Sequence, residues 1–145
     1  LIEYLRYNLP GFVFSVGISP ALAAGTLEAI RQLRHNPAIM ADLRRNIRCF
    51  AECAQKHGFD ICLAGETAIL PVLVGKDDNA FALSNEMRRR GVFVPPAVFP
   101  AVPRNKARLR FCVISEHKPE QIERALDVLE EAAEALHITL PRRQG

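Results

Sequence analysis

Residues 95–103 read PPAVFPAVP, and residues 107–111, ARLRF, follow a few positions later. The run Leu109–Ile114 is rich in β-branched, aromatic and other apolar residues, which predicts a β-strand. Arg110 lies inside this run, shortly after a loop stiffened by prolines. Because a guanidinium stays charged and carries a rigid fork of donors, a partly buried arginine needs a carboxylate or phosphate beside it. The residues alone leave three interpretations of Arg110: a ligand for a substrate carboxylate, a partner of an internal acid, or a residue on the solvent face of an edge strand.

The segments around this stretch predict a mixed order of helices and strands. Ser19 as N-cap and Pro20 as first helical residue indicate a helix start. Pro71 indicates an edge strand or a bulge, because proline cannot donate to a sheet. The patterns predict helices over 1–7, 21–33, 39–54 and 80–90 and from 119 onward, strands over 68–74, 92–94 and 109–114, a strand or extended segment over 12–15 and a polar turn over 75–79. This order predicts an α+β fold in which helices pack on a small, largely antiparallel sheet.

The composition is that of a folded globular chain. It has 145 residues, of which 49% are hydrophobic, enough to form the core of one domain. The formal net charge is +3 and the basic residues interleave with acidic ones, which does not favour nucleic acid as a partner. The apolar runs are shorter than a bilayer span, and the first residues do not read as a signal peptide. We therefore expect no membrane span and a cytoplasmic location.

The four cysteines, at 49, 53, 62 and 112, lie in apolar or helical contexts. This distribution predicts reduced, buried thiols and not a secreted disulfide framework. Cys49, Cys53 and His57 share one helical face at four-residue steps, which could offer three metal ligands. Because no fourth ligand is near in sequence, we expect these cysteines to pack against the core and no metal to bind.

Several motifs together resemble one enzyme family. They are Tyr4-Leu5-Arg6, the segment 10–15 (PGFVFS), Ser19-Pro20, the end of the proline loop at 100–103 (PAVP), and 107–117 (ARLRFCVISEH). In this order and spacing they look like the α-oxoamine synthases, which are pyridoxal-phosphate enzymes of the class I/II aminotransferase superfamily. The resemblance implies the C-terminal small domain of a PLP-dependent transferase of fold type I. It implies that residues 1–38 form the end of the large domain and an inter-domain helix, and that residues 39–145 form the small domain.

The resemblance also implies a reaction. Such enzymes condense an amino acid with an acyl thioester, carried by coenzyme A or an acyl carrier protein, on a lysine-bound pyridoxal phosphate. In the family that lysine lies upstream of the Tyr-Leu-Arg helix, and none of the lysines at 56, 76, 106 and 118 matches it. We therefore expect no catalytic residue in this chain, which should be inactive alone. We expect the whole enzyme to be a homodimer with shared active sites.

Two residues carry the site implied by the resemblance. Arg110 matches the arginine that holds the carboxylate of the amino acid substrate. Ser15 matches a hydroxyl residue that reaches the cofactor phosphate of the neighbouring subunit. Arg108 is at most supportive or forms a structural ion pair, and His117 suits a capping or packing role before the last helix. Phe99 stands where relatives often have tyrosine, which removes a hydroxyl from the proline loop.

Two alternatives stay open. A PLP-dependent aminotransferase or aldolase relative would also use Arg110. A non-catalytic binding or dimerisation module would account for a chain that lacks the cofactor lysine.

Overall fold

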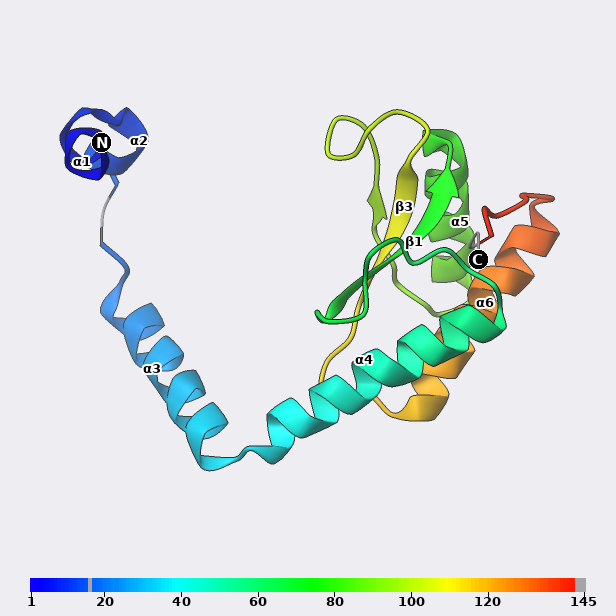
Figure 1. The fold of residues 1–145 in the computed structure, drawn as a ribbon, viewed down its shortest axis with the longest axis horizontal. Helices are drawn as coiled ribbons and strands as arrows, with labels where there is room; N and C mark the ends of the chain where they lie inside the picture. Colours follow the sequence, from blue (N-terminus) through cyan, green and yellow to red (C-terminus); the bar gives the residue numbers. More distant parts are fainter. Residues whose placement is uncertain (16, 143–145) are drawn as a thin grey trace. The chain divides into compact units, whose positions relative to one another are not determined.

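A computed structural model describes residues 1–15 and 17–142 of the chain (Figure 1). The chain divides into two compact units, Leu1–Pro37 and Ala38–Gly145. The assignment of residues 1–38 to a large domain and of 39–145 to a small domain stays a prediction.

The first unit is helical over its described residues. It contains α1 (Ile2–Asn8), α2 (Pro10–Val13) and α3 (Pro20–His35). The predicted helix start at Ser19 is confirmed, because the Ser19 side chain accepts the backbone N–H of Leu22 at 3.4 Å and Pro20 is the first helical residue. The extended segment predicted over 12–15 is wrong. Pro10 has the backbone angle of a first helical residue, and the N–H groups of the next residues fold back onto the Leu9 carbonyl.

The second unit joins a small sheet to three helices in its described part. Its elements are α4 (Ala38–Lys56), β1 (Ile69–Gly75), α5 (Asp77–Arg89), β2 (Pro96–Ala97), β3 (Ala107–Cys112) and α6 (Pro119–Ala135). The strand order is β1-β3-β2, and both strand pairs are antiparallel. Figure 1 shows this sheet beside α5 and α6. The predicted α+β class with an antiparallel sheet is confirmed.

The alternation along β3 separates the core from the open face of the sheet. Ala107, Leu109 and Phe111 are buried, whereas Arg110 and Cys112 between and after them are exposed. The Phe111 ring lies 5.1 Å from the ring of Phe50 on α4, centroid to centroid, inside the core cluster. The inner face of β3 therefore packs on the helices, and its outer face carries the charged residues.

Strand boundaries near the proline loop differ from the prediction. Residues 92–94 do not form a strand, and β2 lies further along, at Pro96–Ala97. A proline fits this place because β2 is an edge strand, which needs no donor on its outer side. β1 is the other edge, so the prediction from Pro71 is confirmed.

The predicted polar turn over 75–79 is wrong in its second half, because α5 begins at Asp77. Asp77 and Asp78 occupy the first turn of this helix, where carboxylates interact favourably with the helix dipole. A charged run that reads as a turn in the sequence is therefore a helix N-terminus.

The cysteines divide between core and surface. Cys53 is buried and Cys49 half-buried, as predicted, but Cys62 and Cys112 are exposed, which contradicts the prediction for these two. Cys112 is exposed because the strand period places it on the outer face of β3. Over the described residues, no helix is long and apolar enough to cross a membrane.

Candidate functional site

The candidate site lies on the open face of the sheet. Arg108 and Arg110 point to this face from β3, because residues two apart on a strand share a side. Pro71 of β1 pairs opposite Arg110, and Ala97 of β2 pairs opposite Arg108. The cross-strand neighbours of both arginines are therefore apolar and uncharged.

The backbone of Arg110 is hydrogen-bonded, whereas its guanidinium contacts no polar partner among the described residues. Its N–H donates to the carbonyl of Pro95 at 2.9 Å, which ties the strand to the start of the proline loop. Among residues 1–15 and 17–142, its guanidinium has no hydrogen bond or ion pair, and the residue is exposed. The alternative of an internal acid as its partner is thus not found in the described chain. The guanidinium is available to an external anion.

The cations that precede Arg110 have neutral neighbours. Arg108 is half-buried and donates from Nε to the carbonyl of Lys106 at 3.2 Å. Arg104 lies over the ring of Phe99, with its Cζ 4.3 Å from the ring centroid. The aromatic ring at position 99 therefore supports a guanidinium here. The ion pair considered for Arg108 is not present in the part of the chain that the structure describes.

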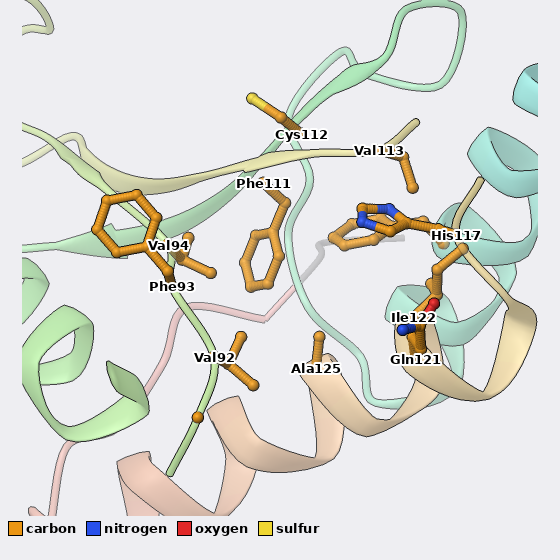
Figure 2. A pocket seen from close by; sticks show the side chains of 12 residues that line it. Val92, Phe93, Val94, Phe111, Cys112, Val113, His117, Gln121, Ile122 and Ala125 are labelled. Carbon is orange, nitrogen blue, oxygen red and sulfur yellow. The ribbon is translucent and has the colours of Figure 1, made fainter. Parts of the chain in front are cut away.

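A cavity of about 250 Å³ lies beside β3 and α6 (Figure 2). Phe111 borders it from β3, Val113 from just after the strand, and Ile122 and Ala125 from α6. Arg110 does not line it. The cavity is therefore separate from the guanidinium of Arg110, which carries the charge suited to a carboxylate.

Ser15 lies in the first unit, just after α2. Its hydroxyl donates to the carbonyl of Phe12 at 2.7 Å, and the side chain is exposed. This bond closes the turn that ends α2. To hold a phosphate, the hydroxyl would have to rotate away from its own turn.

A buried asparagine positions the turn after β3. Asn46 of α4 is fully buried, and its Nδ2 donates to the carbonyls of Ile114, Ser115 and His117 at 2.9, 3.2 and 2.7 Å. His117 in turn accepts the N–H of Ile114 on Nδ1 at 3.3 Å and so closes this turn, while the N-cap of α6 is Lys118. Sequence reasoning missed Asn46. Its signal is a polar residue among the apolar positions of α4.

In the structure, the three residues considered as metal ligands, Cys49, Cys53 and His57, have other neighbours. The His57 ring lies between two carboxylates of α6, with Nδ1 2.8 Å from Glu130 and Nε2 3.3 Å from Asp127. Burial and the neighbouring Cys49 raise the pKa of the Cys53 thiol to about 11, which keeps it protonated. His57, the residue after α4, thus links the end of this helix to α6 through its contacts with the two carboxylates. Within the described residues, no group of three or more such side chains could hold a metal ion.

Comparison with known proteins gives homologues of the chain. No family model matches the chain. It is 38% identical over 138 residues to 8-amino-7-oxononanoate synthase 1 of Bacillus velezensis, a match that covers 95% of this chain and 35% of the relative. It is 32% identical over 127 residues to serine palmitoyltransferase of Sphingobacterium spiritivorum, covering 88% of this chain and 32% of that protein. The chain is homologous to the α-oxoamine synthases.

The structural comparison agrees with this family. The serine palmitoyltransferase structure from Sphingomonas wittichii matches with a TM-score of 0.79 at 28% identity, over 97% of this chain and 35% of that one. The α-oxoamine synthase homologue thus has part of the PLP-dependent transferase fold. It spans about a third of the length of the curated relatives that it matches.

Proposed function

We propose that this chain is the C-terminal part of an α-oxoamine synthase, a PLP-dependent acyltransferase that condenses an amino acid with an acyl thioester. The names of its relatives, 8-amino-7-oxononanoate synthase and serine palmitoyltransferase, support this reaction class. In this proposal residues 1–38 belong to the large domain and the connecting helix, and residues 39–145 form the small domain. The whole enzyme would be a cytoplasmic homodimer.

Arg110 is the residue that would bind the substrate. The observation that carries this role is an exposed guanidinium on the outer face of β3 with no acidic partner among the described residues. Its donor fork matches the two oxygens of an amino acid carboxylate. Two parallel hydrogen bonds would fix the amino acid in one orientation, which lowers the entropy cost of reaching the transition state.

The residues present fit only part of a cofactor site. Bound pyridoxal phosphate supplies an electron sink for the carbanion formed from the amino acid. From this chain, Ser15 would donate its hydroxyl to the cofactor phosphate once it turns from the Phe12 carbonyl. The four lysines of the chain are all exposed, at a helix end, in loops or at a helix start. The lysine that binds the cofactor covalently would therefore come from another part of the enzyme.

The test uses Arg110→Ala in the intact enzyme, with Arg48→Gln as the control. Arg48 is an exposed arginine of α4 in the same unit. Loss of a charged carboxylate clamp should weaken amino acid binding by about 2 to 4 kcal/mol, or roughly 30- to 700-fold in Kd. The measurement is a titration of the cofactor absorbance with glycine, alanine and serine, repeated with acyl-CoA present.

The outcomes separate the alternatives. Unchanged amino acid affinity in Arg110→Ala would remove this residue from the mechanism. Amino acid turnover that needs no acyl thioester would favour an aminotransferase or aldolase. No cofactor absorbance in the intact protein would favour a binding or dimerisation module.

A further inference from the structure

An acid-free stretch surrounds the candidate site. Between Met87 and Ser115 the chain contains no aspartate or glutamate. The same stretch holds seven basic residues: Arg88, Arg89, Arg90, Arg104, Lys106, Arg108 and Arg110. The first three adjoin the end of α5 and are engaged, Arg88 over the Phe93 ring and the other two with Glu86. The last four form a separate group along the loop and β3.

We call Arg104, Lys106 and Arg108 the cationic strip. In the described part of the chain, no carboxylate forms an ion pair with any of them. The charges of Asp60, Arg108 and Lys106 all act on the Cys62 thiol, so this acid lies in the same region as the strip. Its carboxylate is engaged elsewhere, because it accepts the Cys62 N–H at 2.8 Å. Because like charges this close together repel one another and no ion pair in the described residues neutralises them, the strip attracts anions.

The strip extends from the proposed substrate arginine in one direction. A strand rises about 3.3 Å per residue, which places the backbone of Arg108 about 7 Å from that of Arg110, and Lys106 directly precedes the first residue of β3. Arg108 shares the open face with Arg110, and Arg104 is held by its contact with the Phe99 ring. The geometry suits an extended ligand that reacts near Arg110 and carries anionic groups at its far end.

We propose that the cationic strip binds the phosphate groups of a coenzyme A thioester. This inference rests on the proposed function, because it assumes that an acyl thioester reacts beside Arg110. The pantetheine arm of coenzyme A separates the thioester from the diphosphate and the 3′-phosphate. Arginine forks match phosphate oxygens, and Lys106 adds a point charge. A carrier protein would instead bury about 800 Å² of each partner, whereas the strip is one narrow segment.

The test measures binding of coenzyme A to the intact enzyme directly, by equilibrium dialysis without turnover. The variant is Arg104→Gln with Lys106→Gln, and the control is Arg44→Gln with Arg48→Gln, which removes two exposed charges from α4. We expect the strip variant to bind coenzyme A about ten-fold more weakly or worse. The loss should be smaller with dephospho-coenzyme A as the probe, and the control should bind like the wild type.

Unchanged coenzyme A affinity in the strip variant would overturn the proposal. A defect confined to thioesters of a carrier protein would overturn it as well and assign the strip to a protein partner. The cofactor absorbance and its amino acid titration should be unaffected in the strip variant. If the strip variant loses coenzyme A while Arg110→Ala keeps its amino acid affinity, the phosphate site stands and the assumed role of Arg110 fails.

Discussion

Arg110 and Phe111 are neighbours in the sequence but have opposite surroundings. The Phe111 side chain is 6% exposed within the core, whereas Arg110 lies on the open face with no charged partner in the described residues. The strand period separates them, because successive side chains leave a strand on opposite faces. A charged residue can therefore stand in an apolar strand without the cost of burying its charge.

The pKa of the Cys62 thiol depends on the charges of the nearby cations. Although the residue is exposed, partial desolvation raises the pKa of the Cys62 thiol above 9.0 and Asp60 raises it further, while Arg108 and Lys106 lower it. Arg108→Gln removes a positive charge that favours the thiolate, so we expect the Cys62 pKa to rise further and alkylation at a fixed, mildly alkaline pH to slow. The rate should be measured against pH in a Cys112→Ser background, since Cys112 is also exposed.

Arg104→Gln is the control for this measurement. Arg104 is not among the charges that act on Cys62, and its guanidinium rests on Phe99. An equal slowing of alkylation in Arg104→Gln and Arg108→Gln would mean that general charge, and not the neighbouring guanidinium, sets the thiol reactivity.

At the scale of elements, β3 is positioned by its neighbouring strands and by the turn that follows it. It pairs with β1 along its whole length and with β2 at Arg108 and Leu109, and the turn after it is held by Asn46 of α4. Because Arg110 lies in the middle of this strand, the orientation of the candidate substrate arginine depends on a helix that begins far earlier in the sequence.

Asn46→Ala should destabilise the protein. The substitution removes the donor to three carbonyls of the turn and leaves a small cavity in the core, at a cost of about 2 to 3 kcal/mol. Asn85→Ala is the control, because Asn85 is an exposed asparagine of α5. Urea unfolding of both variants gives the difference, and similar unfolding free energies for the two would show that the Asn46 bonds add nothing net.

At the scale of the whole molecule, the second unit is held by its core and by ion pairs between helices. Arg90, just after α5, lies 3.0 Å from Glu86 and 3.0 Å from Glu131 of α6, which also pairs with Arg124 at 2.6 Å. Hydrogen bonds from Arg90 and Arg124 lower the pKa values of the two carboxyls below 4.5. Their contribution is therefore present above the unfolded-state pKa and is lost as the pH falls through the lower folded-state values.

Arg90→Gln should reduce this acid dependence. In the wild type, stability should decrease as the pH falls below 4.5, while the variant should show a shallower decrease from a lower starting value. Thermal unfolding at a series of pH values gives both slopes, with Arg48→Gln as the control. Parallel slopes in the wild type and Arg90→Gln would exclude Arg90 as the source of the carboxyl shifts.

The sequence by itself determined the helices other than α2, the antiparallel class of the sheet and the start of α3. These features are local, since apolar spacing, an N-cap serine and a first-turn proline act within a few residues. It also singled out Arg110 and Ser15, through position in motifs and not through geometry.

Only the tertiary structure decided which face each side chain occupies and what it contacts. Residues 92–94 have strand composition but no strand, because pairing with β3 occurs at Pro96–Ala97. Asn46 gains its role from a turn that lies about seventy residues later, and Arg110 keeps its guanidinium free because no acid of the described residues contacts it. Such contacts join distant parts of the chain, and no local pattern encodes them.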